Sequence, residues 1–332
     1  MKQISLECET ITPLFWGGAD GRVVELRPPA LKGILRFWWR AIRAFTAGYR
    51  EKEAQIFGGG HGNKVKSAFT IRLDGQDVKN NSSLDKLPAH HNVKGHKLNI
   101  LEYLAYGTYD YKKGEGNIFN RPYIKPGYKF RLLIDLKGDM HCQDELLEAL
   151  QVFFLFGALG ARSRNGFGNI ALTDSNPSEY KQKLMALPEK ELIEKYLTQK
   201  EKPDFTAFSS HCKLFKTIKE YDTWDACLAA LGFAYRECRL SLPLQERQYI
   251  GAPLIDQASK RNIARLERHA KPYFLRVHRT KNNRYTGYIL YLPSLYCTGL
   301  SGNAAGESIN QQFAGVCTKL NNELARRLEV VI

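Results

Sequence analysis

Two spacings of apolar residues divide the first half of the chain into strands and helices. Apolar and polar residues alternate over 127–137 and, in the same way, at the N-terminus, which is the period of a strand with one buried face. Strands are predicted at 2–12, 68–74, 127–137 and 167–172. Helical spacing begins at Pro28-Pro29, where proline suits the first turn, and recurs over 143–156. The apolar face of the first helix consists of Leu31, Ile34, Leu35, Trp38, Ile42 and Phe45.

In chain order these elements read β-α-β-β-α-β, with a long polar insertion at 75–120 before the third strand. This order predicts an α+β fold of the ferredoxin-like (RRM-like) type, in which two helices cover one face of an antiparallel sheet. The C-terminal part repeats the pattern less clearly, with a hairpin at 272–292 and a terminal helix. We therefore expect two ferredoxin-like domains, the first at 1–174 with the insertion and a degenerate second at 205–332. A linker or helical connector at 175–204 joins them.

The charge of the chain narrows the classes of partner. At 332 residues it has a formal net charge of +15, which favours nucleic acid, an anionic membrane surface or an acidic protein. No apolar run is long enough to cross a bilayer, so a membrane is disfavoured. The seven cysteines are scattered and never spaced as C-x-x-C, which is typical of free thiols in a reducing compartment. We expect a cytoplasmic protein with no disulfide framework, cofactor or metal.

A loop with four glycines and two arginines follows the helix at 143–156. Glycine permits φ > 0 and a close approach of backbone N–H groups to a ligand, and guanidinium groups match phosphate geometry. The order helix, loop, strand excludes both a P-loop and a dinucleotide fingerprint. The alternative is a helix end followed by a tight turn with solvated arginines. The candidate RNA-binding residues of the loop are Gly160, Arg162, Ser163, Arg164, Gly166 and Gly168.

The first helix carries a basic stripe opposite its apolar face. Lys32, Arg36, Arg40 and Arg43 recur at steps of four, four and three residues, where like charges repel by roughly 0.2–0.5 kcal/mol per pair. Since Glu25 is the only acid nearby in the sequence, we expect an anionic ligand to offset this repulsion. The alternative is a solvated helix face.

A second basic region runs from Ser259 to Arg284, with nine Lys or Arg residues and one acid, Glu267. Aromatic residues are interleaved with these cations, a composition suited to single-stranded nucleic acid. Arg265 and Arg276 are the candidate contacts in this region. The aromatic residues also alternate as in a strand, so at least half of them are expected in the core.

Catalytic signals are weak. The sequence has no H-E-x-x-H, no G-x-S-x-G and no cluster of carboxylates. Asp20 lies in a glycine-rich loop where a metal-dependent nuclease places a carboxylate, although an Asp before Gly21 is typical of a turn. His61 and His91 lie in polar loops and are the only acid–base pair we consider.

Several motifs resemble one known family. Residues 12–20 (TPLFWGGAD) and 25–40 (ELRPPALKGILRFWWR) resemble the opening of RAMP superfamily proteins of CRISPR type III-B (Cmr) effector complexes. The similarity is greatest to the first-numbered Cmr subunit. It extends over 56–59, 101–107 and the loop at 160–168, and is fainter at Ala270–Val277: AKPYFLRV.

The resemblance implies two ferredoxin-like domains and a place near the end of the complex that holds the 3′ region of the CRISPR RNA. By position, Lys32 and Arg36 would hold guide phosphates, and the glycine loop would contact RNA. Its implied partners are CRISPR RNA, target RNA and other Cmr subunits. Because RNA cleavage in this family belongs to another subunit, we expect a non-catalytic RNA-binding protein. Two alternatives stay open: an endoribonuclease using Asp20 or a loop histidine, and a scaffold that docks on sister subunits.

Overall fold

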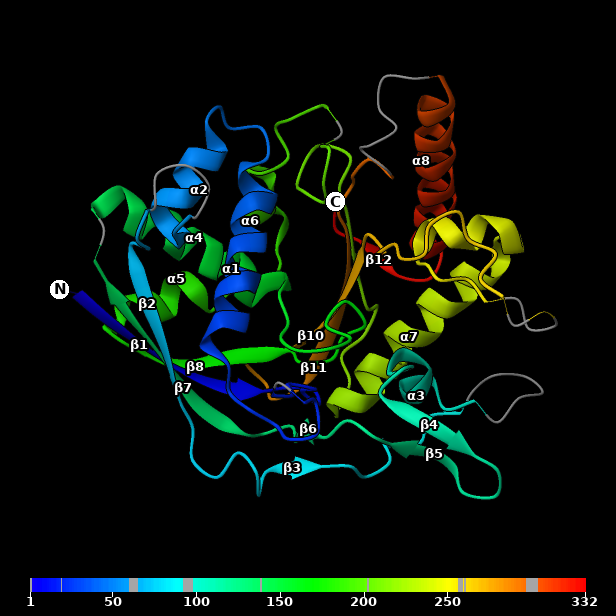
Figure 1. Cartoon of the computed structure of the whole chain (residues 1–332), viewed down its shortest axis with the longest axis horizontal. Coiled ribbons are helices and arrows are strands. Elements are labelled where there is room, and N and C mark those ends of the chain that lie inside the picture. The colour runs from blue at the N-terminus through cyan, green and yellow to red at the C-terminus, as the bar shows by residue number, and fades with distance from the viewer. Residues whose placement is uncertain are drawn as a thin grey trace.

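The computed structural model describes residues 2–18, 20–59, 65–91, 98–137, 139–201, 203–255, 259, 261–296 and 304–332. The first half forms a four-stranded antiparallel sheet in the order β2-β7-β1-β8 (Figure 1). These strands are β1 (Lys2–Thr10), β2 (Phe69–Asp74), β7 (Lys129–Leu136) and β8 (Ile170–Asn176). Helices α1 (Pro28–Arg43) and α4 (Met140–Phe156) cover its apolar face. The expected α+β class is confirmed.

The second half forms another antiparallel sheet, in the order β10-β11-β9-β12. Its strands are β9 (Lys213–Lys216), β10 (Tyr273–Arg279), β11 (Tyr285–Tyr291) and β12 (Glu329–Val330). Helices α7 (Trp224–Ser241) and α8 (Ala304–Ala325) pack on one face, and a 3-10 helix, η1 (Leu244–Ile250), follows α7. The predicted hairpin is confirmed, since β10 and β11 pair along their whole length.

The second sheet is buried on both faces. Tyr273, Leu275 and Val277 of β10 belong to the core under α7 and α8, whereas Phe274 belongs to the core of the first half. Phe274 contacts Phe37 and Trp38 of α1, with ring centroids 5.9 and 5.4 Å apart. Alternate residues of one strand therefore face different cores, and the two halves share an extensive apolar boundary.

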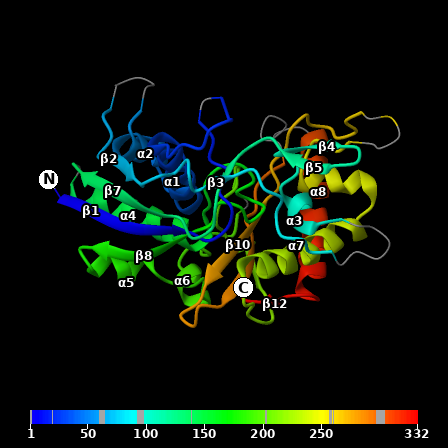
Figure 2. The same ribbon diagram turned by 90° about the horizontal axis from the view of Figure 1, so that it is seen from below.

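The insertion packs mainly against the second half of the chain rather than against the first half. It contains β3 (Ser82–Ser83), α3 (Ile100–Leu104), β4 (Tyr109–Lys112) and β5 (Gly116–Phe119), and β6 (Tyr123–Ile124), which pairs with β3, follows it. Figure 2 shows α3 and the β4–β5 hairpin lying beside α7 and α8, far from β2. Ile100 and Leu104 pack on Gly232 of α7, where an added Cβ would lie within 3.0 Å of both side chains.

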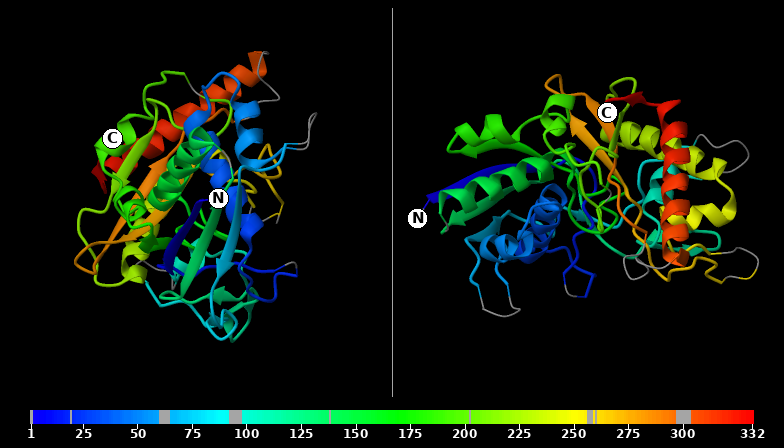
Figure 3. Two further views of the ribbon diagram at one scale, coloured as in Figure 1. Left: turned by 90° about the vertical axis from the view of Figure 1, so that its left-hand side faces the viewer. Right: turned by 90° about the horizontal axis from the view of Figure 1, so that it is seen from above.

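Two helices were not predicted by the apolar spacing: the highly charged α2 (Tyr49–Phe57), which packs against α1, and α5 (Glu179–Leu184). Helix α6 (Lys190–Glu194) follows Pro188, where the sequence predicts a short helix, and it lies with α5 within the expected connector. Tyr180, Leu184 and Ile193 are buried in the first core, so this connector is packed. The views in Figure 3 show α5 beside β8 and the C-terminus beside the second sheet. None of the described helices combines the length and apolarity needed to cross a bilayer.

Candidate nucleic-acid interface

The glycine-rich loop is tied into the protein by its own backbone. Gly160, Gly166 and Gly168 have φ values of +76°, +87° and +69°, the region that glycine enters most easily. The N–H of Gly168 donates to Pro13 O at 2.9 Å, and that of Gly166 donates to Ser163 O at 3.4 Å. These two N–H groups are therefore not available to a phosphate, and the tight-turn alternative describes this end of the loop.

Packing explains the same two glycines. A Cβ on Gly168 would overlap the carbonyl oxygen of Leu159, and one on Gly166 would overlap Leu228 of α7. The loop also adds to the edge of the second sheet, where Leu275 N donates to Arg164 O at 3.2 Å. The loop thus lies at the boundary between the two halves and contacts both of them.

Gly168→Ala is expected to lower the free energy of unfolding by about 2 kcal/mol, because left-handed strain and overlap with a backbone carbonyl act together. Gly127→Ala is the matched control, since Gly127 has φ +86° but open space around its Cα. It should cost about 1 kcal/mol, the strain alone. Denaturant unfolding measures both; equal losses would contradict the packing role.

Two predicted RNA contacts, Arg164 and Arg276, lie at this boundary. Arg276 is 2% exposed and donates to the carbonyl oxygens of Phe154, Gly157 and Ile170. Burial lowers the pKa of Arg276 to about 9 and that of Arg164 to about 10. Arg164 donates to Lys271 O at 2.5 Å and lies over the Phe274 ring. The interpretation of Arg276 as an RNA contact is wrong, because Nη1 and Nη2 of its guanidinium donate to buried backbone carbonyl groups.

The basic stripe of α1 has carboxylate partners within the chain. Arg40 forms a bidentate ion pair with Glu53 of α2 at 2.5 and 2.6 Å, and Arg36 lies 3.3 Å from the same carboxylate. Arg43 pairs with Glu145 and Glu148 of α4. The expectation that an external anion offsets their repulsion is corrected: three glutamates do so. Lys32 alone has no carboxylate partner among the described residues, and its Nζ lies 5.0 Å from the Phe69 ring centroid.

The second basic region is divided in the structure. Arg279 forms a bidentate pair with Glu9, and Arg284 contacts Asp222 at 3.2 Å. Arg265 and Arg268 are exposed, and no ion pair involves either of them within the described part of the chain. Lys271 is different: its Nζ is buried 4.2 Å from the Tyr235 ring centroid, and burial and Arg164 lower its pKa well below the usual value. Lys260 lies outside the described residues.

Two exposed cations remain at the glycine loop: Arg162, which was predicted as a contact, and Arg121, which was not. The pKa of Arg162 is lowered by partial desolvation and by Arg121. No carboxylate pairs with either guanidinium in the described segments. Arg121 ends the polar insertion just before Pro122, so only its position after the aromatic-rich hairpin marks it in the sequence.

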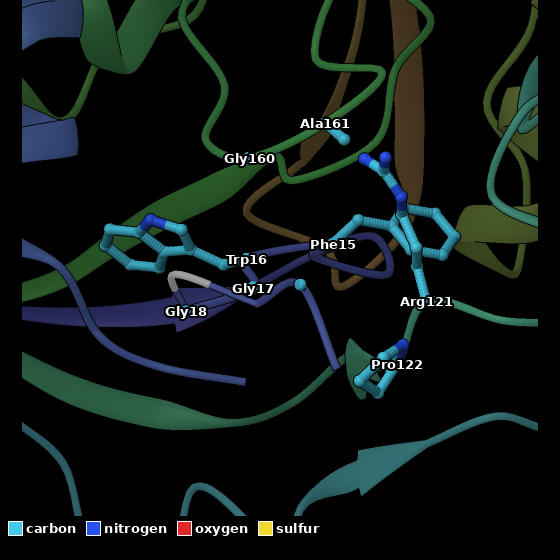
Figure 4. Close-up of a pocket in the computed structure, with 9 residues that line it drawn as sticks. Phe15, Trp16, Gly17, Gly18, Arg121, Pro122, Gly160 and Ala161 are labelled. Carbon is cyan, nitrogen blue, oxygen red and sulfur yellow. The ribbon is translucent and has the colours of Figure 1, made fainter. Parts of the chain in front are cut away.

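Arg121 borders a pocket of about 220 Å³ between two glycine-containing loops. Figure 4 shows the Arg121 side chain extending toward Ala161. The pocket is too small for a drug-sized ligand. It is lined by Phe15, Trp16, Gly17, Gly18, Gly21, Arg121, Pro122, Gly160 and Ala161.

The candidate catalytic residues are not brought together. Asp20 Oδ1 accepts a hydrogen bond from Arg22 N at 2.9 Å, the turn role expected of Asp before Gly. His91 is exposed, and His61 lies outside the described residues. Across the described ranges, no group of three or more His, Cys, Asp or Glu side chains is arranged to hold a metal ion.

Two sequence comparisons relate the chain to known proteins. A model of the RAMP superfamily matches residues 7–171. The CRISPR system Cmr subunit Cmr1-2 of Pyrococcus furiosus is 36% identical over 84 residues, which are 24% of this chain and 43% of that protein. The match therefore spans less than half of that relative's length.

Two solved structures share the fold across nearly the whole chain. The apo crystal structure of Cmr1 from Pyrococcus furiosus superposes with a TM-score of 0.58 and 18% identity, covering 99% of this chain and 98% of that one. A chain of the cryo-EM structure of the type III-B Cmr-beta complex bound to cognate target RNA gives 0.55 and 12% identity, covering 97% and 99%.

Proposed function

This chain belongs to the RAMP superfamily, and from that premise we propose that it is a non-catalytic RNA-binding subunit of a cytoplasmic type III-B (Cmr) effector complex. Its partners would be the CRISPR RNA near its 3′ region, target RNA and other Cmr subunits. The similarity to a Cmr subunit and to a chain of a Cmr complex bound to target RNA supports this proposal. So does the net charge of +15.

The strand orders support two ferredoxin-like domains, at 1–174 and 205–332. In each sheet the strands of one β-α-β-β-α-β series lie in the order fourth, first, third, second: β8-β1-β7-β2 and β12-β9-β11-β10. The connector at 175–204 packs on the first of these domains.

The observation that carries the RNA-binding role is a pair of exposed arginines beside the pocket, Arg121 and Arg162, which have no carboxylate partner among the described residues. Elsewhere on the chain several conspicuous cations, such as Arg40, Arg43 and Arg279, meet carboxylates. Cations left without such partners neutralise phosphates at little rearrangement cost. Lys32 and Arg265 are further candidates of the same kind. Ser163 and Gly160 would adjoin the RNA through the loop.

The test is RNA binding by the full chain and by the reconstituted Cmr complex over a salt series. If the subunit neutralises about four phosphates, the logarithm of affinity should fall with the logarithm of salt concentration with a slope of roughly −3. Fluorescence anisotropy with labelled CRISPR RNA measures this slope. An absence of binding at low salt in both forms, with assembly proceeding normally without RNA, would instead favour the scaffold alternative.

A further inference from the structure

A highly exposed tyrosine, Tyr106, lies near Arg162, which in turn lies near Arg121. Tyr106 is 68% exposed, although large aromatic side chains are normally covered in a monomeric domain. It is the last ring of a connected series that starts in the core. Successive ring centroids from Phe167 to Tyr106 are 5.3, 6.1, 5.5 and 6.3 Å apart, through Phe15, Phe119 and Tyr109. The packed rings beneath Tyr106 support it from one side only.

The glycine that follows Tyr106 leaves space for a guanidinium group. Gly107 has φ +88°, and a Cβ there would overlap the guanidinium of Arg162. Arg162 itself has φ +60°, a conformation that costs a non-glycine residue about 1–2 kcal/mol. Strain of this kind persists where the surrounding structure enforces it, often at functional sites.

The two nearby carboxylates accept hydrogen bonds from asparagine side chains. Glu102 accepts a hydrogen bond from Asn117 Nδ2 at 2.7 Å, and Asp110 accepts one from Asn120 Nδ2 at 2.7 Å. Within the described residues, neither pairs with Arg121 or Arg162. The exposed ring therefore adjoins Arg162, and neither Arg162 nor its neighbour Arg121 has a carboxylate partner within the described residues.

We propose that Tyr106 is a stacking platform for one unpaired RNA base, with Arg121 and Arg162 on the phosphates that flank it. The proposal rests on the RNA-binding function proposed above and assigns its base-contacting residue. Aromatic rings accept any base through its π-face, and arginines supply the electrostatic part, which is the usual division in single-strand binding. The pocket beside Arg121 leaves room for the backbone of the strand as it continues.

The test compares Tyr106→Ala and Tyr106→Phe in the full chain and in the reconstituted complex. The probe is an oligouridine of about 12 nucleotides, followed by fluorescence anisotropy. Tyr106→Ala should weaken binding roughly tenfold without changing the salt dependence, because no phosphate contact is lost. Tyr106→Phe should stay within about twofold of the wild type, since the ring is kept.

Tyr111→Ala is the matched control. Tyr111 is 73% exposed on β4, five residues after Tyr106, but adjoins none of these cations in any described contact, so its removal should leave affinity unchanged. An abasic strand should bind the wild type and Tyr106→Ala equally. Wild-type affinity of Tyr106→Ala would overturn the stacking role alone, whereas failure of the wild type to bind any RNA would overturn the proposed function and this role with it.

Discussion

Replacing Arg276 by Met is expected to lower the free energy of unfolding by roughly 4 kcal/mol. Methionine keeps the apolar stem but removes the donors to Phe154 O and Ile170 O, at 2.8 and 2.5 Å, and to Gly157 O. Each buried carbonyl left without a donor costs about 1–3 kcal/mol. Relief from burying the charge offsets part of this loss. Three orphaned acceptors outweigh one desolvated guanidinium.

Arg284→Met is the control for this prediction. Arg284 directly precedes β11 but is exposed, and its ion pair with Asp222 is a surface pair worth at most about 1 kcal/mol. Denaturant unfolding of both variants separates the two cases. If Arg276→Met is as stable as the wild type and binds RNA poorly, the interpretation of Arg276 as an RNA contact would have to be reinstated.

The sequence predicted the four strands of the first sheet and the long helices because their patterns are local, whereas the short strands β3 to β6 were not predicted. Along most of β7, exposed charged residues alternate with buried apolar ones; the exceptions are Leu133, which is apolar, and Asp135, which is buried. Helix α2 was missed since YREKEAQIF has no continuous apolar stripe. It is stabilised instead by contacts that only tertiary structure creates, such as the pair between Glu53 and Arg40.

The roles of the cations were harder to predict, because their partners are distant in the sequence. Arg43 meets Glu145 and Glu148, more than a hundred residues away. A count of nearby charges cannot detect such pairs. One signal was available, however: Arg276 lies two residues from Phe274, so strand alternation places both on the same buried face.

The roles of the loop glycines were also difficult to predict from the sequence. Their φ values suit both a phosphate cradle and a tight turn, and the sequence alone does not distinguish the two. The deciding contacts are with Leu159 and with Leu228 of α7, and the second lies about sixty residues further along the chain. Arg162 in the same loop is exposed, and its guanidinium lies against Gly107 with no carboxylate partner among the described residues.

Charge reversal at Arg121 and Arg162 is expected to weaken RNA binding about a hundredfold, about tenfold for each cation, without destabilising the fold. Neither guanidinium has a carboxylate partner in the described chain, and each lies in the positive field of the other. Removing both therefore sacrifices no internal ion pair. The control is Lys137→Glu combined with Lys213→Glu, which makes the same change of net charge. Both lysines are exposed, Lys137 directly after β7 and Lys213 on β9, and this variant should weaken binding much less.

Arg162→Gly separates the two roles of that residue. Glycine relieves the strain of φ +60°, so the free energy of unfolding should stay within about 1 kcal/mol of the wild type, while affinity for RNA falls. Salt titration of anisotropy should show a slope smaller by about 0.7, one phosphate contact. If Arg162→Gly lost stability and kept its affinity, the left-handed arginine would be a packing feature. If instead affinity falls at unchanged stability, the backbone strain is maintained for the ligand.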